Sequence, residues 1–491
     1  MGNILKETCN GHEITSRYDI LGRRTHTASS LGADIATELD SLSNVTSIET
    51  QGWQAKIDYD RQGLEIQRSL SGGLTAQTRR DKTGRVRYQN AVINGQTTHL
   101  HREYQWGIDD RLAKIIDLKT NETTAFEYND RGFLTRAVYG GKEEIWRTAD
   151  KLGNLYESEA QTDRFYKSSQ LIKTATATYK YDSEGFLIEK NESDKTWQYL
   201  WTAGGMLKEV QRPDGSVVSF AYDAFGRRIE KKTSKTITRF LWDGNVPLHE
   251  WKEFDYKETT DNDRITWVFQ GFTPVAKIQG DKSYSIISDH IGTPLQAIDT
   301  QGNKVWEREL DIYGRVRKEE GEKGFCNMLY QGQYLDTETE LVYNYKRYYS
   351  QETGAYISQD PIGLAGGLNL YSYVHDSNFW VDIFGLNGTP QLPNETILSE
   401  GNTKIVHYYN NPTEHAEPIH FHIEENDNSI GKIKADGTLI SGRTNKIAQN
   451  LVKQSKNKLR KAEKKIANYL RKVRKIVAGK PFKYGNRGCK S

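Results

Sequence analysis

A short motif, Tyr-Asp-x-x-Gly followed by arginine or a hydrophobic residue, recurs along the first 315 residues. Successive glycines are often 20 or 21 residues apart, as between Gly63 and Gly84 or Gly132 and Gly153. In such a unit an aromatic strand enters the turn, the Asp side chain bonds the turn backbone, and glycine supplies a positive φ. Each copy therefore predicts a β-hairpin. Copies lie at 18–23, 59–64, 128–133, 181–186 and 222–227, and degenerate copies at 81–85, 150–154 and 311–315.

The fixed spacing of these hairpins also predicts how they assemble. One hairpin is not stable alone in water, so neighbouring copies must pair edge to edge into a long sheet. An ordinary β-sandwich has similar turns, but its turns do not keep a fixed period. We therefore expect a mainly β chain whose YD-repeat hairpins form a spiral β-sheet. The 28 Tyr and 10 Trp residues are typical of strands.

Composition excludes several classes of protein. The many aromatic residues and the net charge of only +3 exclude a disordered chain. No apolar run is long enough for a transmembrane helix, and the first residues, MGNILKETCNGHE, lack the apolar stretch of a signal peptide. The three cysteines, Cys9, Cys326 and Cys489, are too far apart for a disulfide scaffold or a cysteine zinc cluster.

Charge divides the chain into two parts of opposite sign. Residues 387–491 hold 20 Lys and Arg against 9 Asp and Glu, whereas residues 1–386 hold 48 against 56. The last 49 residues are the extreme case, with 17 basic residues and one acid, Glu463. A basic part on an acidic body makes nucleic acid a candidate partner, and the two parts also attract each other.

A specific segment connects the repeats to a known family. Residues 330–374, YQGQYLDTETELVYNYKRYYSQETGAYISQDPIGLAGGLNLYSYV, resemble the core-associated segment of the RHS/YD-repeat family along their whole length. This family includes bacterial polymorphic toxins and the animal teneurins, and the resemblance covers roughly residues 15–386. It implies a hollow β-shell that encloses a variable C-terminal toxin. We accordingly assign residues 1–329 to repeats, 330–386 to the core-associated segment, 387–403 to a linker and 404–491 to a toxin domain.

The resemblance also implies self-cleavage. Asp360-Pro-Ile-Gly-Leu is echoed by Asp382-Ile-Phe-Gly-Leu, 22 residues later. In related shells such a pair resembles an aspartyl-protease dyad that cuts after the second Gly-Leu, which here is the Leu386–Asn387 bond. Two close carboxylates can share a proton, so that one activates water and the other polarises the carbonyl. The chain departs from the family at Ile383, where Pro is usual, and at Gln359, where some relatives have Arg; the alternative is that both aspartates only cap turns.

The family does not specify the activity of the tail, so its fold is read from its residues. We expect strands at 404–411 and 419–425, and a hairpin over 430–441 that turns at Asp436-Gly437. Hydrophobic residues then recur at three- and four-residue spacing from about 444 to 477, with Lys and Arg between them, which predicts a basic helix. The tail is therefore a small α+β domain.

The chemistry of the tail centres on its histidines. His420 and His422 are two apart on a predicted strand and so share one face, and His407 and His415 are near in sequence. Such a pair could act as acid and base in phosphodiester cleavage, or hold a divalent metal with Glu424 or Glu417 as third ligand. We expect an RNase or a DNase. The residues expected to contact phosphate are Lys461, Lys464, Lys465, Arg471, Lys472, Arg474 and Lys475.

These interpretations imply a biological setting. We expect this chain to be the C-terminal part of a longer polymorphic toxin used in interbacterial competition, with a delivery module or secretion apparatus elsewhere. Its toxin would act in the cytoplasm of a target cell, and a cognate immunity protein would protect the producer. The alternative is a non-enzymatic, cell-surface or adhesive repeat protein whose basic tail binds nucleic acid or an anionic surface. A membrane-disrupting tail ranks last, because the helix is poor in Trp and Phe.

Overall fold

The computed structural model describes residues 3–61, 63–107, 111–386, 388–390, 395–400, 403–407, 421–425, 428–434, 436, 438–442, 444–454 and 459–460. The chain divides into two compact units. The first comprises Met1–Asp58, Ile66–Arg79 and Val86–Gln391, and the second Tyr59–Glu65, Arg80–Arg85 and Leu392–Ser491. Within the described ranges, every helix is too short or too polar to cross a membrane.

Two large sheets make up most of the first unit, and in both the strands follow one another in sequence order. The 14-stranded sheet consists of β1 (Lys6–Cys9), β2 (His12–Tyr18), β3 (Arg24–Ser29), β4 (Asp34–Leu39), β5 (Val45–Thr50), β6 (Trp53–Tyr59), β7 (Glu65–Leu70), β8 (Leu74–Arg80), β9 (Val86–Ile93), β10 (Thr97–Trp106), β11 (Leu112–Asp117), β12 (Thr123–Tyr128), β13 (Leu134–Tyr139) and β14 (Glu143–Trp146).

A short pair, β15 (Thr148–Ala149) and β16 (Leu155–Tyr156), leads to the second large sheet. Its 16 strands are β17 (Arg164–Lys167), β18 (Gln170–Thr174), β19 (Ala177–Tyr181), β20 (Leu187–Glu192), β21 (Lys195–Trp201), β22 (Leu207–Gln211), β23 (Val217–Tyr222), β24 (Arg228–Lys232), β25 (Thr236–Asp243), β26 (Val246–Phe254), β27 (Arg264–Gln270), β28 (Thr273–Gln279), β29 (Lys282–Ser288), β30 (Pro294–Asp299), β31 (Lys304–Leu310) and β32 (Val316–Gly321). The prediction of a mainly β chain of successive hairpins is confirmed.

The Asp-x-x-Gly turns have the geometry that the motif predicts. In the first turn Asp19 Oδ1 accepts the backbone N–H groups of Leu21 and Arg23, both at 2.9 Å, and Gly22 has a φ of 77°. The Arg23 side chain returns to the same carboxylate, with Nε 2.7 Å from Oδ2. This ion pair explains why arginine follows the glycine: it fixes the conformation of the outgoing strand.

The meander turns back on itself within the first unit. Strands β2–β10 pack against β25–β30 through one continuous hydrophobic cluster that includes Trp53 and Leu295. Polar contacts join the same strands, since Trp53 Nε1 donates to Ser285 Oγ at 2.9 Å and Arg24 pairs with Asp243 at 2.8 Å. The strands therefore wind past one another, as a spiral requires.

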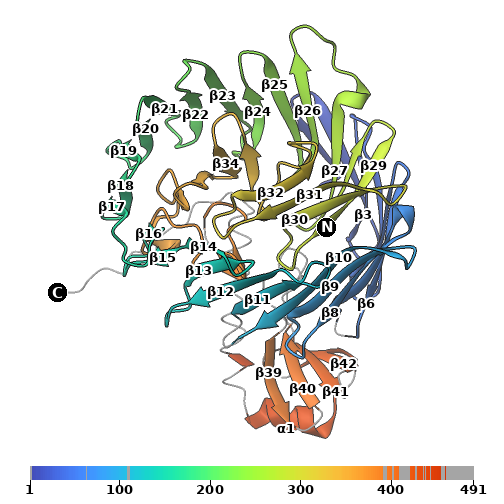
Figure 1. Cartoon of the computed structure of the whole chain (residues 1–491). Coiled ribbons are helices and arrows are strands. Elements are labelled where there is room, and N and C mark those ends of the chain that lie inside the picture. The colour runs from blue at the N-terminus through green and yellow to red at the C-terminus, as the bar shows by residue number, and fades with distance from the viewer. Residues whose placement is uncertain are drawn as a thin grey trace, which may run out of the picture. The chain divides into compact units, whose positions relative to one another are not determined.

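The core-associated segment lies inside the curve of these strands (Figure 1). It forms a four-stranded sheet of tyrosine-rich strands whose side chains pack on β18–β25. The buried Arg228 of β24 forms a bidentate ion pair with Asp336, which anchors the segment to the large sheet. Its strands are β33 (Tyr334–Asp336), β34 (Leu341–Asn344), β35 (Arg347–Ser350) and β36 (Ala355–Tyr356), followed by the 3-10 helix η4 (Gly363–Ala365), β37 (Trp380–Val381) and β38 (Thr389–Pro390).

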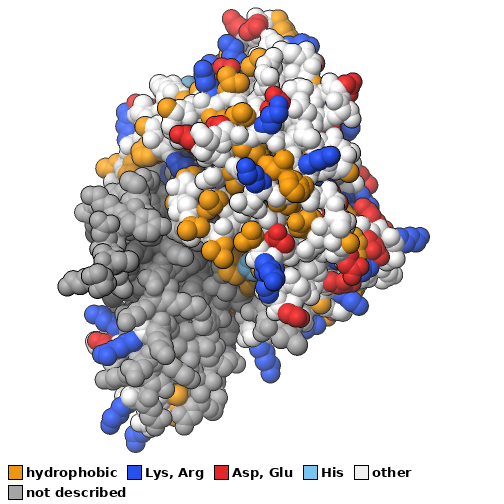
Figure 2. All heavy atoms as spheres, turned by 90° about the vertical axis from the view of Figure 1, so that its left-hand side faces the viewer, with side chains coloured by type: hydrophobic (Ala, Val, Ile, Leu, Met, Phe, Trp, Pro, Cys, Tyr) orange, Lys and Arg blue, Asp and Glu red, His pale blue; other side chains and the backbone are white. Residues whose placement is uncertain are grey.

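The outer side of the first unit carries mixed charge. Figure 2 looks onto the side of β17–β21 and shows acidic, basic and apolar side chains interspersed. Phe165, Ile188 and Leu200 are exposed positions of these strands. Because both signs of charge occur together, the described part of this face is unlike the one-signed basic surface that binds phosphate chains.

The second unit contains a five-stranded antiparallel sheet followed by a helix. Strands lie at 403–407 and 421–425, within or beside the expected ranges, and two further strands flank Asp436 as expected; residues 408–411, 419–420 and 437 lie outside the described part. Residues 395–400, which we assigned to the linker, instead form the first strand of this sheet. Of the helix predicted from 444 to 477, the structure describes residues 446–454 and 459–460 as helical, and residues 455–458 and 461–491 lie outside the described part. The elements are β39 (Glu395–Glu400), β40 (Thr403–His407), β41 (Phe421–Glu425), β42 (Asn428–Ile433), β43 (Leu439–Gly442) and α1 (Lys446–Gln454).

Candidate functional site

Two aspartates and one arginine meet inside the first unit. Asp382 follows β37, Asp360 lies three residues before η4, and Arg347 begins β35. Arg347 Nη2 lies 3.2 Å from Asp360 Oδ2 and 3.3 Å from Asp382 Oδ2. All three side chains are at most 5 % exposed. The structure therefore brings the two predicted carboxylates together across one buried guanidinium group.

Asp360 has a carboxyl group with a raised pKa. Burial raises the pKa of its carboxyl to about 6, and the charge of Asp382 acts in the same direction. Arg347 and the Ile362 backbone N–H, which lies 2.9 Å from Asp360 Oδ1, lower that pKa but do not cancel the effect of burial. A carboxyl group that titrates near pH 6 can serve as a general acid or base under physiological conditions.

Asp382 is held by donors from three directions. Tyr356 Oη donates to Asp382 Oδ2 at 2.9 Å, and the Leu386 backbone N–H donates to Oδ1 at 2.8 Å. Asn344 Nδ2 donates to the Asp382 backbone carbonyl at 2.9 Å. The ring of Tyr356 also lies 3.6 Å from the Arg347 guanidinium carbon. These contacts fix the carboxylate and the segment that follows it.

The residue before the expected cleavage point lies between the two carboxylates. Leu386 bonds Asp382 through its N–H, and its carbonyl oxygen borders Gly366. A Cβ atom at Gly366 would overlap Asp360 Oδ2 and would lie 2.7 Å from the Leu386 carbonyl oxygen. The missing side chain of Gly366 therefore leaves the space in which Asp360 approaches that carbonyl.

Arg347 also donates a hydrogen bond to the residue before Leu386. Its Nε donates to the Gly385 carbonyl at 2.5 Å, and its Nη1 donates to the Leu370 carbonyl at 3.0 Å. Sequence reasoning identified the aspartates but missed Arg347, Tyr356 and Asn344. Their position in the segment that carries the family resemblance was the signal available. Asn387, on the far side of the expected cleavage point, lies outside the described residues.

The predicted tail site is described only in part. His407 ends β40 and His422 lies in β41, where it pairs with Val406. The structure describes the backbone of His407, His422 and Glu424 but not their side chains. His415, Glu417 and His420 lie outside the described residues, as do the phosphate-contacting residues Lys461, Lys464, Lys465, Arg471, Lys472, Arg474 and Lys475.

The described part of the chain holds no cluster of three His, Cys, Asp or Glu side chains that could bind a metal ion. The side chains of the proposed metal ligands His420, His422 and Glu424 all lie outside that part. The acid–base and metal-binding roles of the tail histidines thus both stay predictions.

Comparisons with known proteins agree with the fold. The teneurin YD-shell family model matches residues 56–377. The probable deoxyribonuclease RhsA of Dickeya dadantii (strain 3937) is 25 % identical over 431 residues, covering 79 % of this chain and 29 % of the relative. Double-stranded DNA deaminase toxin A of Burkholderia cenocepacia (strain H111) is 27 % identical over 471 residues, covering 81 % of this chain and 32 % of the relative. The chain thus spans about a third of the length of these relatives.

Solved structures show the same architecture. The Photorhabdus luminescens Tc holotoxin pore matches with a TM-score of 0.58 at 16 % identity, covering 77 % of this chain and 21 % of that chain. The crystal structure of TcdB2-TccC3-Cdc42 matches with a TM-score of 0.57, covering 76 % of this chain and 22 % of that chain. At this identity the likeness shows the fold alone. The family model spans well over half of the chain, and the chain therefore belongs to the teneurin YD-shell, or RHS/YD-repeat, family of polymorphic toxins.

Proposed function

We propose that the first unit cleaves its own chain at the Leu386–Asn387 bond and so releases the C-terminal domain. The observation that carries this proposal is the position of Leu386. Its backbone N–H donates a hydrogen bond to the Asp382 carboxylate, and its carbonyl oxygen borders the space beside Asp360. In aspartyl proteolysis one carboxyl group must donate a proton to the carbonyl while the other accepts one from water. The site supplies two carboxyl groups in different surroundings.

The proposed reaction is a hydrolysis. The protonated Asp360 carboxyl donates its proton to the Leu386 carbonyl oxygen, while the Asp382 carboxylate takes a proton from the water that attacks the carbonyl carbon. The tetrahedral species then collapses, the Leu386–Asn387 C–N bond breaks, and the leaving nitrogen takes up a proton. The products are a carboxyl group on Leu386 and an amine on Asn387. Arg347 holds both carboxyl groups and the Gly385 carbonyl in place.

The test is to express the full chain and compare two substitutions of buried aspartates. Asp360→Asn keeps the shape of the side chain but cannot exchange the proton, so the chain should stay intact where the wild type is cut. Asp376→Asn is the matched control, because burial raises the pKa of Asp376 to about 6 as well, yet its carboxyl group accepts the Asn378 backbone N–H and belongs to another turn. Gel analysis that shows equal cleavage in Asp360→Asn and the wild type would reject the role of Asp360.

We further propose that the released domain cleaves nucleic acid. Its strong positive charge supports this proposal, as do the names of two relatives, a probable deoxyribonuclease and a double-stranded DNA deaminase toxin. His420 and His422 are the proposed acid–base or metal-binding pair, with His407 as a further candidate.

The chain offers a matched control for this second proposal, since β10 contains another His-x-His sequence, His99 and His101. Expression of the full chain in bacteria should degrade DNA or RNA. Replacing His420 and His422 with Ala should abolish this degradation of nucleic acid, whereas replacing His99 and His101 with Ala should not. Intact nucleic acid with the wild-type chain would reject the nuclease and favour an adhesive repeat protein with a phosphate-binding tail.

The biological setting is proposed on the same basis. We infer that the domain is delivered into the cytoplasm of a target cell by a module or apparatus outside this chain, and that a cognate immunity protein neutralises it. Support comes from the toxin names among the relatives. Co-expression of the immunity protein, sought as a small acidic protein encoded immediately downstream, should restore growth of cells that express the wild-type chain.

A further inference from the structure

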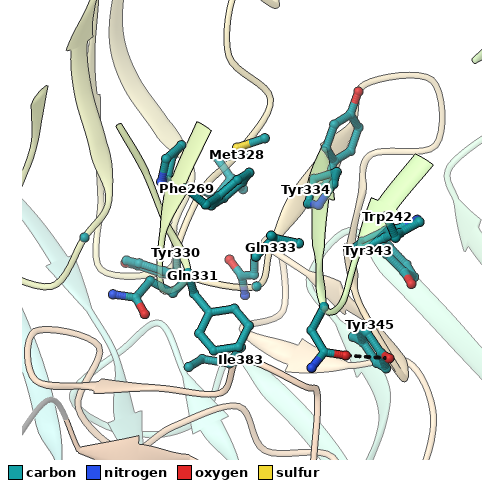
Figure 3. A pocket seen from close by; sticks show the side chains of 18 of the residues that line it. Trp242, Phe269, Met328, Tyr330, Gln331, Gln333, Tyr334, Tyr343, Tyr345 and Ile383 are labelled. Carbon is teal, nitrogen blue, oxygen red and sulfur yellow. Dashed lines mark hydrogen bonds between the residues drawn. The ribbon is translucent and has the colours of Figure 1, made fainter. Parts of the chain in front are cut away.

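A separate pocket lies in the first unit, between strands β25–β28 and the start of the core-associated segment (Figure 3). Its volume is about 50 Å³, and its walls are mainly aromatic. Trp242 and Phe269 come from the large sheet, Tyr334 and Tyr343 come from the core-associated segment, and Ile383 closes one end. Self-cleavage as proposed above uses none of these side chains.

The polar atoms of the aromatic wall are already engaged elsewhere. Tyr334 Oη donates to Glu250 at 2.5 Å, Trp242 Nε1 donates to the Arg228 carbonyl at 2.7 Å, and Tyr345 Oη donates to Asn245 Oδ1 at 3.1 Å. The wall therefore presents mostly carbon to the pocket, which favours an apolar body in any ligand.

Two polar side chains of the lining are incompletely bonded: the Nε of Arg228, a donor, and the Oε1 of Gln333, an acceptor, have no hydrogen-bond partner among the described residues. Gln333 is 3 % exposed, and within the described part of the chain its Oε1 is a buried acceptor without a hydrogen-bond partner. Figure 3 shows this side chain between Tyr330 and Tyr334 on the pocket wall. A buried acceptor that stays unbonded costs free energy, so a donor is expected to reach it.

The orientation of the Gln333 amide follows from its neighbours. Asn344 Nδ2 donates to the backbone carbonyls of Gly332, Asp382 and Ile383, which leaves Asn344 Oδ1 as the acceptor. Gln333 Nε2 lies 3.3 Å from that oxygen and must be the donor. The free atom of the Gln333 amide is thus an oxygen, and the missing partner must be a hydrogen-bond donor.

We propose that this pocket binds a small neutral alcohol whose hydroxyl group donates to Gln333 Oε1. A volume of about 50 Å³ accommodates roughly four water-sized groups, which matches a molecule of about four heavy atoms. The aromatic wall contacts its hydrocarbon part. A charged ligand is disfavoured, because the Arg228 guanidinium in the lining is already paired with Asp336, so the charge of the ligand would be buried without an opposite charge of its own.

The test uses two probes with the same heavy-atom skeleton, propan-2-ol and acetone, of which only the first has a donor. Ligand-observed saturation-transfer NMR with the full chain should show saturable binding of propan-2-ol at millimolar concentration, and binding of acetone at least about tenfold weaker. Gln333→Leu should remove this preference, because the substitution removes the acceptor.

A second pair of variants keeps the proposal testable if Gln333→Leu does not fold. Val246→Phe fills the pocket from its rim and should abolish binding, whereas Val217→Phe, at an exposed position of β23, should leave it unchanged. Equal binding of the two probes to the wild-type chain, or no saturable binding of propan-2-ol, would overturn the proposal and leave ordered water as the partner of Gln333.

Discussion

At the scale of single residues, the proposed self-cleavage depends on how one buried carboxyl group is placed. Asp360 lies in surroundings that raise its pKa to about 6, yet the same side chain contacts Arg347, which opposes that rise. Burial has the larger effect because the carboxyl group is almost completely shielded from water. The position of Leu386 beside it then decides which peptide bond the pair can reach.

This pKa predicts the pH dependence of self-cleavage. The proposed reaction needs Asp360 in its protonated form, and the protonated fraction falls as the pH rises through about 6. The rate of cleavage should therefore decrease by about tenfold per pH unit above that value. To measure this rate, purified intact chain is incubated at several pH values between 5 and 8, and the fraction cleaved is determined in samples taken over time. A rate that increases with pH over this range would instead assign Asp360 the role of base.

Glycine 366 gives a second test at this scale. Gly366 has helical backbone angles, φ −82° and ψ −20°, so alanine is compatible with the backbone. The added Cβ would displace Asp360 from the Leu386 carbonyl, and a misplacement of about 1 Å can slow a reaction about 100-fold. Gly204→Ala is the control, since the nearest atom that the added Cβ would meet, Thr202 Oγ1, is 3.8 Å away. Cleavage of Gly366→Ala at the rate of Gly204→Ala would contradict the proposed geometry.

At the scale of elements, the repeat motif predicted the hairpins because it encodes both the turn and its stabilising contacts. Some turns were missed: Asp40 caps a turn that has Ser43 at a φ of 70° in place of glycine, and Asp289 caps an Asp-x-x-Gly turn in which Ser288 stands in place of the tyrosine. Arg347 was missed for a different reason. Its partners are 13 and 35 residues away in sequence, and the fold that joins them is not encoded in a local pattern.

The repeat turns should therefore contribute unequally to stability. Asp223 accepts two backbone N–H groups and pairs with the buried Arg227 at 2.6 Å. Asp223→Ala should lower the free energy of unfolding by about 1–3 kcal/mol, because buried donors lose their acceptor. Asp214, in an exposed turn, is the control, and Asp214→Ala should cost less than about 0.5 kcal/mol. Urea denaturation measures the free energy of unfolding of both variants. Equal decreases in Asp223→Ala and Asp214→Ala would contradict the importance of the buried pair.

At the scale of the whole first unit, stability depends on contacts between strands distant in sequence. His249 of β26 is completely buried and lies between Ser29, at 2.6 Å from Nε2, and Thr266, at 3.1 Å from Nδ1. It thus links β3 to the second sheet. Burial lowers the pKa of His249 to about 3, so the imidazole stays neutral in the folded chain at moderately acidic pH.

This histidine should make the folded state sensitive to acid. Below pH 6.5 the unfolded chain takes up a proton at His249 that the folded chain does not, so this contribution to stability is lost as the pH falls toward 3. Between pH 7.5 and pH 5 the wild type should lose about 2 kcal/mol relative to His249→Gln. Urea denaturation at both pH values measures this, with His101→Gln as control. Parallel pH dependence of wild type and His249→Gln would contradict the assignment.

The central claim, hydrolysis of one peptide bond by the Asp360 and Asp382 pair, is tested most directly by mass spectrometry of the full chain after self-cleavage in water enriched in ¹⁸O. We predict two fragments, 1–386 and 387–491, with one ¹⁸O atom in the new carboxyl group of Leu386 and Asn387 as the first residue of the released domain. A chain that remains intact, a cut at another bond, or a Leu386 carboxyl group without ¹⁸O would contradict the account.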